Sequence, residues 1–256
     1  MIILRFVAIA DTDIGISKET NQDSVLVKHA SCEIGEVMMA IICDGMGGLS
    51  KGELASATVI REFSKWFDEE LPYELNRLDM QVIGDKWSHL LKSLNTKILE
   101  YAQSRNISIG TTFSGILLVG RQYVIVHVGD TRVYHIGASL KQLTTDHTFI
   151  AREIKRGNMT PEQAQKDKRR NMLLQCVGAS ERLEPEIIVG ETENDAYMVC
   201  SDGFRHEITE NEIYESLNPT NLHNKKGMRA NVKYLINLVK QRKEKDNISV
   251  VLIKVD

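Results

Sequence analysis

Five aspartates stand in short polar stretches of this 256-residue chain, and four of them lie directly at the end of an apolar run. Asp44, Asp130 and Asp202 each follow such a run, Asp246 precedes one, and Asp23 lies in a polar turn. Because runs of this kind are typical of strands, the pattern predicts carboxylates at strand ends. Carboxylates that meet at one sheet edge repel each other unless cations neutralise them, and oxygen ligands suit hard cations such as Mg²⁺ or Mn²⁺. The pattern therefore indicates a metallohydrolase.

The distribution of apolar residues predicts nine strands and three helices. The strands are rich in Val and Ile and are bounded by Gly, Asp or Asn. They cover residues 2–10, 24–29, 36–43, 111–119, 122–128, 132–136, 185–190, 196–200 and 248–255. The helices cover residues 50–71, 79–104 and 224–243.

The first two predicted helices each carry an apolar stripe on one face. Ser50 and Glu53 fit a capping box at the start of the first helix, and Leu54 belongs to its stripe. Val82 and Trp87 belong to the stripe of the second. The two helices follow each other without an intervening strand, which argues against a doubly wound parallel fold. The order instead favours an α+β fold in which helix pairs cover antiparallel sheets.

Composition sets the class of protein. With 42% hydrophobic residues, only four prolines and no linker-like stretch, the chain is expected to form one domain over residues 1–256. A net charge of −3 gives no overall attraction to nucleic acid or an anionic membrane. No apolar run approaches the roughly 20 residues of a membrane helix, and the apolar start is too short for a signal peptide. The four cysteines lack zinc-like spacing, so we expect a cytoplasmic protein with reduced cysteines.

The segment Asp44-Gly45-Met46-Gly47-Gly48 carries the most specific signal. Glycine after aspartate lets the backbone approach a cation, so the carbonyl of Gly45 becomes a candidate ligand beside the Asp44 carboxylate. The later glycines leave room for a phosphate. Taken alone, Asp-Gly is a common turn. However, Asp202-Gly203 repeats the pattern, and Asp246 supplies a third carboxylate.

Together these motifs resemble the metal-dependent protein phosphatases of the PPM class, also called type 2C. The matching elements occur in the family's order over nearly the whole chain. They are Gly15-x-x-Lys18-x-x-Asn21-Gln22-Asp23, Asp44-Gly45-Met46-Gly47-Gly48, Gly110-Thr111-Thr112, Gly129-Asp130-Thr131-Arg132, Ser201-Asp202-Gly203 and Asp246-Asn247. The resemblance implies a four-layer α-β-β-α sandwich, in which two packed antiparallel sheets are flanked by helix pairs.

The resemblance also implies a set of ligands for two Mn²⁺ or Mg²⁺ ions. Asp44 would bridge both ions, and the carbonyl of Gly45 would bind one of them. Asp202 and Asp246 would bind the other ion. In this scheme Asp44, Asp202 and Asp246 are catalytic, because they act through the water that the metals activate.

Two further aspartates have secondary roles by the same likeness. Asp23 would act mostly through metal-bound water, and Asp130 would hold a weaker third ion with Asp202, as in bacterial members. Two divalent ions about 4 Å apart can acidify a bridging water, align it with phosphorus and neutralise the charge on the phosphoryl oxygens. No phosphoenzyme is then needed. The rival nucleophile is a cysteine, but none of the four precedes a glycine-rich anion loop that ends in arginine.

Two residues depart from the family pattern. Lys18 stands where arginine usually grips the substrate phosphate, and lysine acts as a point charge where an arginine fork binds two oxygens. We predict that Lys18 binds phosphate, with an ordinary exposed lysine as the alternative. Met46 replaces the histidine that animal members use as a proposed general acid. Bacterial members commonly share this methionine, which points to bacteria and to protonation of the leaving group by water.

The remaining charged segments and histidines carry less information. The resemblance places a variable flap at about residues 147–180, and residues 148–172 contain seven Lys and Arg against three Asp and Glu. A positive flap would favour acidic phosphorylated polypeptides, and a solvated helical surface is the alternative. The basic residues of 224–245 accompany a regular apolar stripe, which favours a packed helix over nucleic-acid binding. His127 lies in an apolar strand and is expected in the core; His147 receives no role.

The sequence therefore predicts a bacterial, metal-dependent serine/threonine phosphoprotein phosphatase that opposes a partner protein kinase. Its substrates would be phosphorylated proteins, and nothing in the chain requires more than a monomer. Two alternatives are a phosphatase of small phosphate monoesters and a catalytically silent phosphoprotein-binding module. The silent module is expected to lack a metal carboxylate, whereas Asp44, Asp202 and Asp246 are all present.

Overall fold

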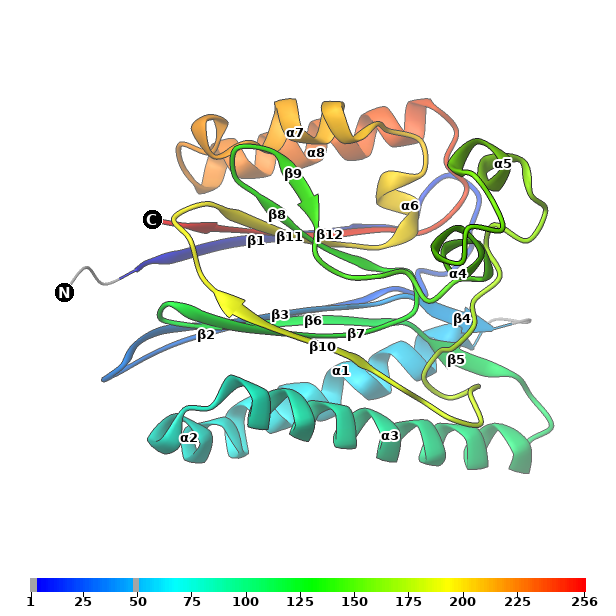
Figure 1. Ribbon diagram of the computed structural model, residues 1–256, viewed down its shortest axis with the longest axis horizontal. Coiled ribbons are helices and arrows are strands. Elements are labelled where there is room, and N and C mark those ends of the chain that lie inside the picture. Colours follow the sequence, from blue (N-terminus) through cyan, green and yellow to red (C-terminus); the bar gives the residue numbers. More distant parts are fainter. Residues whose placement is uncertain (1–3, 48–50) are drawn as a thin grey trace.

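The computed structural model describes residues 4–47 and 51–256. Two five-stranded sheets lie face to face, with helices on both outer sides (Figure 1). All strand pairs in both sheets are antiparallel. The predicted four-layer α-β-β-α sandwich is confirmed.

The two sheets contain strands from distant parts of the chain. Sheet 1 has the order β1-β12-β11-β8-β9, and sheet 2 has the order β10-β7-β6-β3-β2. Sheet 1 comprises β1 (Phe6–Asp13), β8 (Arg132–Ile136), β9 (Leu140–Gln142), β11 (Ala196–Cys200) and β12 (Ile248–Val255). Sheet 2 comprises β2 (Ser24–Cys32), β3 (Gly35–Cys43), β6 (Phe113–Val119), β7 (Gln122–Val128) and β10 (Glu186–Glu191). The short strands β4 (Gly45–Gly47) and β5 (Ile109–Thr111) form a separate pair.

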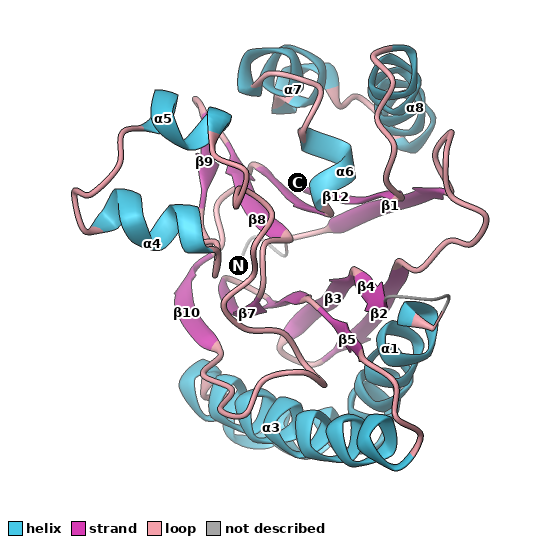
Figure 2. Ribbon diagram, turned by 90° about the vertical axis from the view of Figure 1, so that its right-hand side faces the viewer, coloured by secondary structure: helices cyan, strands magenta, loops and turns pink. Residues whose placement is uncertain are grey.

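Helices cover the outer face of each sheet. Helices α1 (Gly52–Glu69) and α3 (Met80–Ser104) pack on sheet 2, whereas α7 (Glu210–Leu217) and α8 (Lys225–Gln241) pack on sheet 1 (Figure 1). The shorter helices are α2 (Leu71–Glu74), α4 (Phe149–Lys155), α5 (Pro161–Lys166) and α6 (Asp202–Arg205), with 3₁₀ turns at Leu75–Arg77 and Pro219–Asn221. Helices α4 and α5 belong to the flap and lie at one end of the sandwich (Figure 2).

Three apolar clusters fill the three spaces between the four layers. Successive side chains of a strand point to opposite faces, so each central strand contributes to two clusters. In β3, Met39 and Ile41 pack against α1 and α3, while Met38 and Ile42 pack between the sheets. The near-continuous apolar runs of the sequence therefore correspond to strands that are buried on both faces.

Several details of the predicted elements are wrong or lie outside the described residues. Ser50, the predicted cap, is not described, and α1 begins at Gly52. Leu54 is 40% exposed because it lies five residues before Val59, roughly on the other side of the helix. Val82 is 43% exposed beside the fully buried Ile83. The Asp-Gly turn is instead the start of β4, which pairs with β5.

Strand register brings the acidic segments to one edge of the sandwich. Ser24 pairs with Cys43, which places Asp23 and Asp44 at the same end of sheet 2. In sheet 1, Cys200 pairs with both Val250 and Arg132, so the segments that carry Asp202, Asp246 and Asp130 meet at the corresponding end. The view along the sandwich shows this end between the α4–α5 flap and helix α6 (Figure 2). Within the described ranges, the helices are too short or too polar to cross a bilayer.

The aromatic contacts under sheet 2 give a test of the packing. Trp87 is fully buried, and its ring meets Phe63 and Trp66 edge-on at centroid distances of 5.1 and 5.5 Å. Trp87→Ala should lower the free energy of unfolding by about 3–5 kcal/mol because it leaves a large cavity. Trp87→Phe is the control and should cost much less, since it keeps ring contacts and removes an indole N–H that has no partner within residues 4–47 and 51–256. Urea denaturation measures both, and equal costs would contradict this packing.

Candidate active site

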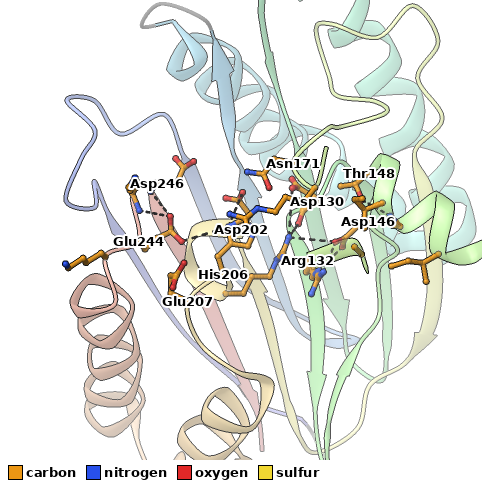
Figure 3. A pocket seen from close by; sticks show the side chains of 18 of the residues that line it. Asp130, Arg132, Asp146, Thr148, Asn171, Asp202, His206, Glu207, Glu244 and Asp246 are labelled. Atoms are coloured by element: carbon orange, nitrogen blue, oxygen red, sulfur yellow. Dashed lines mark hydrogen bonds and ion pairs between the residues drawn. The ribbon is translucent and has the colours of Figure 1, made fainter. Parts of the chain in front are cut away.

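A cleft of about 970 Å³ opens at the edge where the acidic segments converge. Among its lining residues are Lys18, Asp130, Asp202 and Asp246, all candidates from the sequence (Figure 3). Asp44 is half-buried at the end of β3. Burial raises the pKa of Asp44 well above its usual range, and the charges of Asp23, Asp202, Asp130 and Asp246 act in the same direction. The five aspartates therefore form one electrostatic cluster.

Backbone hydrogen bonds fix the position of Asp44. Its N–H donates to Oγ1 of Thr112 at 2.9 Å, and its carbonyl accepts from the Thr112 N–H at 2.9 Å. The Thr111 hydroxyl donates to the same carbonyl at 2.9 Å. These contacts explain the Gly110-Thr111-Thr112 motif, because its two threonines hold the strand end from which the carboxylate projects.

Gly45 is required by close packing. A Cβ atom at Gly45 would lie 2.4 Å from the carbonyl oxygen of Gly52 and 2.5 Å from that of Gln22. Helix α1 and the segment before β2 therefore approach this backbone more closely than any side chain allows. The carbonyl of Gly45 is thus held beside Asp44.

The backbones of the segments that carry Asp202 and Asp246 also approach each other closely. A Cβ atom at Gly203 would lie 2.2 Å from the carbonyl oxygen of Asn247. The Asn247 side chain accepts from the Gln22 N–H at 2.9 Å and donates to the Ile14 carbonyl at 3.0 Å. Asn247 therefore ties the start of β12 to the loop that carries Lys18, and this explains why asparagine follows Asp246.

The acidic cluster fits divalent cations. Both carboxylate oxygens of Asp23 and one of Asp202 are buried and have no hydrogen-bond partner among the described residues. Burial raises the pKa of Asp23 to about 7, with the charges of Asp202 and Asp246 adding to the shift. Oxygen atoms left unpaired in a crowded anionic site need positive charge nearby, and hard divalent cations accept such ligands.

Asp130 is held by arginines to which the sequence analysis assigned no role. Arg205, in α6, donates from Nη2 to the Asp130 carbonyl at 2.9 Å and lies 3.8 Å from the Asp146 carboxylate. Arg132 binds Asp146 through two contacts of 2.8 and 2.7 Å. Burial and the charge of Asp202 raise the pKa of Asp130 to about 7, although Arg205 and Arg132 oppose the shift. Arg132 stood in a quoted motif, but its partner Asp146 lies too far along the chain for spacing to reveal.

Lys18 reaches the site but contacts a carboxylate. Its Nζ lies 2.8 Å from Oδ1 of Asp246, and its side chain is 38% exposed. Partial burial would lower the pKa of Lys18, but the contact with Asp246 and the charges of Asp44 and Asp202 raise it above its usual value. Lys18 is therefore a charged side chain at the cleft and not a remote surface lysine.

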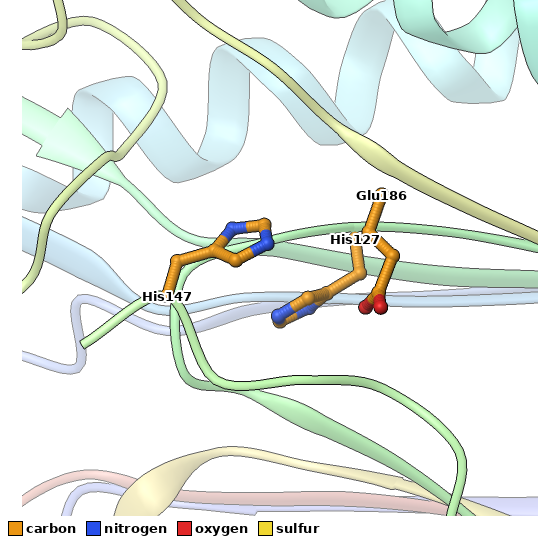
Figure 4. A group of neighbouring side chains, drawn as sticks. All are labelled: His127, His147 and Glu186. Atoms are coloured by element: carbon orange, nitrogen blue, oxygen red, sulfur yellow. The ribbon is translucent and has the colours of Figure 1, made fainter. Parts of the chain in front are cut away.

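A second group of potential ligands, His127, His147 and Glu186, lies beside the flap (Figure 4). His127 is fully buried, as expected for a core residue, and both its ring nitrogens have partners in Ser114 and the Thr145 carbonyl. Nδ1 of His147 accepts from the Gly129 N–H at 3.2 Å and from Gln175 at 2.8 Å. His147 therefore links the loop of Asp130 to the base of the flap, a structural role that its sequence context did not suggest.

The three buried cysteines do not provide a nucleophile. Cys43, Cys176 and Cys200 are buried, and all four cysteines are free. Burial raises the pKa of the Cys43 and Cys176 thiols and raises that of Cys200 to about 12. Because the thiolate is the reactive form, these residues are inert at neutral pH.

Comparison with known proteins agrees with this geometry. Residues 16–252 match the family model described as protein phosphatase 2C. Protein phosphatase PhpP of Streptococcus pneumoniae is 29% identical over 206 residues, which cover 79% of this chain and 80% of PhpP.

Solved structures show the same likeness. The serine/threonine phosphatase of S. agalactiae superposes with a TM-score of 0.86 at 27% identity, covering 98% of this chain and 100% of the other. The catalytic domain of the phosphatase PstP, a protein of Mycobacterium tuberculosis, was solved with two manganese ions; it gives a TM-score of 0.79 at 27% identity and covers 98% of this chain and 99% of its own.

The close approach at Gly203 provides a test of how the cluster is assembled. Gly203→Ala should push the start of β12 away from α6, lowering the free energy of unfolding by about 1–3 kcal/mol and weakening Mn²⁺ binding. Gly227→Ala, in α8, is the control, because its Cβ would meet only Asn224 at an ordinary 3.8 Å. Thermal denaturation and calorimetric Mn²⁺ titration measure the two effects. Wild-type Mn²⁺ affinity in Gly203→Ala would contradict the assembly described here.

Proposed function

Because the chain belongs to the protein phosphatase 2C family, we propose that its aspartate cluster holds two Mn²⁺ or Mg²⁺ ions for the dephosphorylation of phosphoserine and phosphothreonine. The chain is a serine/threonine protein phosphatase, related to bacterial enzymes of that name. The observation that carries the metal assignment is the set of buried carboxylate oxygens of Asp23 and Asp202 that lack a partner.

The proposed ligands follow from their positions. Asp44 and the carbonyl of Gly45 stand together at the end of β3, and Asp202 and Asp246 stand together across the Gly203 contact. We assign Asp44 as the bridging ligand, with the other two carboxylates on one ion and the carbonyl on the other. Bound divalent cations of this kind acidify a coordinated water and offset the charge that develops on the phosphoryl oxygens.

Two aspartates at the margin of the cluster are assigned weaker roles. Asp130, with Asp202, is proposed to hold a third ion of lower affinity, because Arg205 and Arg132 already offset part of its charge. Asp23 is proposed to act through water, since its buried oxygens have no hydrogen-bond partner in the described part of the chain.

Among the three basic side chains of the cleft that lie beside its aspartates, Lys18, Arg132 and Arg205, Lys18 is the proposed phosphate ligand. Arg132 uses Nε, Nη1 and Nη2 for Asp146 and Tyr134, and Arg205 is held by the Asp130 carbonyl. Lys18 is bound only through one carboxylate that is itself a proposed metal ligand. When a cation binds Asp246, the Lys18 ammonium is therefore free to turn to a phosphate oxygen. Water is the proposed proton source for the leaving group, because Met46 has no proton to donate.

The biological setting is also part of the proposal. Phosphorylated proteins are the substrates, and a serine/threonine kinase is the partner whose action this enzyme reverses. Free cysteines fit a reducing compartment such as the cytoplasm, and the domain is proposed to act as a monomer. The cleft is lined by charged side chains and is not the apolar, shape-selective pocket that small-molecule enzymes use, which favours a protein substrate.

Replacement of Asp44 tests the metal assignment. Asp44→Asn should lower kcat by at least about a hundredfold, because a neutral amide replaces the charged bridging ligand. Mn²⁺ titration by calorimetry should show weaker binding, while circular dichroism should show an intact fold. EDTA should abolish wild-type activity, and Mn²⁺ should restore it. Activity of Asp44→Asn within tenfold of wild type at saturating Mn²⁺ would exclude the two-metal assignment.

Replacement of Lys18 tests the phosphate contact. Lys18→Met should lower kcat/KM for phosphopeptides about tenfold to a hundredfold, the effect of losing a charged hydrogen bond. Lys18→Arg should preserve kcat/KM, because guanidinium also binds phosphate. Calorimetry separates this role from an effect on metal binding, since Lys18→Met removes a competitor for Asp246 and should not weaken Mn²⁺ affinity. Unchanged kcat/KM in Lys18→Met would show that Lys18 does not bind the phosphate.

A further inference from the structure

The cations that line the cleft fall into two groups. Three are held by carboxylates: Lys18 by Asp246, Arg132 by Asp146, and Arg205 near Asp130 and Asp146. The other three, Arg170, Lys243 and Lys245, are exposed and have no carboxylate partner among the residues that the structure describes. These three form what we call the basic rim.

The basic rim has two sides. Arg170 follows α5 in the flap, whereas Lys243 and Lys245 lie in the loop between α8 and β12. The flap and helix α8 stand on opposite sides of the site (Figure 2). Cations that are unpaired in the described part of the chain therefore line the cleft from both the flap and the α8–β12 loop.

The flap contributes fewer cations to the cleft than its composition indicated. Arg152 and Arg156 pair with Glu153, and Arg169 pairs with Asp167. Of the flap cations without such a partner, Arg170 is the one that lines the cleft. Within the described residues, the flap thus places a single unpaired cation at the cleft, and the other two unpaired cations come from the opposite side.

Local backbone structure holds Lys243 and Lys245 outward. Lys243 has a φ of 68°, in the left-handed region, and ends the last turn of α8. The buried Glu244 turns inward, and its carboxylate accepts from the N–H groups of Lys245 and Asp246 at 2.6 and 2.9 Å. Both lysines therefore point away from the protein on either side of one buried anchor. Two carboxylates that have no Lys or Arg partner among the described residues, Glu207 and Glu244, also line the cleft. They reduce the positive charge of the rim, but its three cations still outnumber them.

We propose that the basic rim selects phosphoprotein segments with acidic residues on both sides of the phosphorylated residue. This inference rests on the proposed function, because it assumes that the phosphate enters the aspartate cluster. The proposal rests on charge complementarity, because three exposed cations flank a cleft whose interior is anionic. The net charge of the chain is −3, so this positive rim is a local feature. Arg170 would meet acidic residues on one side of the phosphate, and Lys243 with Lys245 would meet those on the other.

Steady-state kinetics on matched peptides tests the proposal. One phosphothreonine peptide carries Glu at two positions on each side of the phosphate, and the other carries Gln at the same positions. Exposed charge pairs contribute about two- to fivefold each, so the wild type should prefer the acidic peptide about tenfold in kcat/KM at low salt, mainly through KM. Raising the salt concentration should reduce this preference.

Variants identify the residues responsible. Lys243→Gln with Lys245→Gln should reduce the preference to about threefold or less, and Arg170→Gln should reduce it about twofold. The control is Lys226→Gln with Lys233→Gln, which removes the same charge from exposed positions of α8 outside the cleft and should leave the preference unchanged. Hydrolysis of p-nitrophenyl phosphate with Mn²⁺ should be equal in all of these proteins.

The outcomes separate this inference from the proposed function. Wild type that fails to hydrolyse p-nitrophenyl phosphate with Mn²⁺ would overturn the proposed function itself. Normal hydrolysis of that ester without a preference for the acidic peptide would overturn the role of the basic rim alone. A preference that survives in the Lys243–Lys245 variant, or that is lost equally in the Lys226–Lys233 control, would also overturn it, because net charge or another surface would then be responsible.

Discussion

Repulsion among carboxylates at one edge of two sheets is the constraint on which the rest of this structure depends. For Asp23 and Asp130 the pKa rises from 3.8 to about 7, which means that ionisation is less favourable in the folded chain than in the unfolded chain. In the metal-free protein, the contribution of these two carboxyls to the free energy of unfolding therefore falls as the pH rises between those two values. The proposed cations would offset this cost, because they would stabilise only the form in which the carboxylates converge.

The scaffold opposes this repulsion with rigid, mostly neutral contacts. Thr111 and Thr112 hold the backbone of Asp44, and Asn247 ties the β12 start to both ends of the loop that carries Lys18. Gly45 and Gly203 allow backbone approaches that any side chain would prevent. Such contacts act on backbone atoms and leave the carboxylates free. The two antiparallel sheets supply the stiffness, since each carries apolar side chains on both faces.

The sequence predicted the features that depend on local pattern. Apolar runs located the buried strands, and two consecutive helices without an intervening strand indicated the layered antiparallel fold. The apolar pattern gave wrong predictions where tertiary contacts determine which side chains are buried. Leu54 and Val82 are apolar yet exposed, because the sheet covers another face of each helix. The arginine pairs with Asp146 and the contact between Lys18 and Asp246 join residues that are far apart in the sequence, so their spacing carries no signal.

Negative and positive side chains occupy different parts of the cleft. Carboxylates lie inside, where burial and mutual repulsion make cation binding favourable, and Arg132 and Arg205 limit that repulsion at the side of Asp130. A cation can bind a carboxylate of the substrate only if it lies too far from the internal aspartates to pair with them. Lys18 lies closer to the aspartate cluster, and its ammonium group pairs with Asp246. Lys243 and Lys245 avoid this outcome because Glu244 turns inward between them, so the buried carboxylate orders the loop while both ammonium groups stay in solvent.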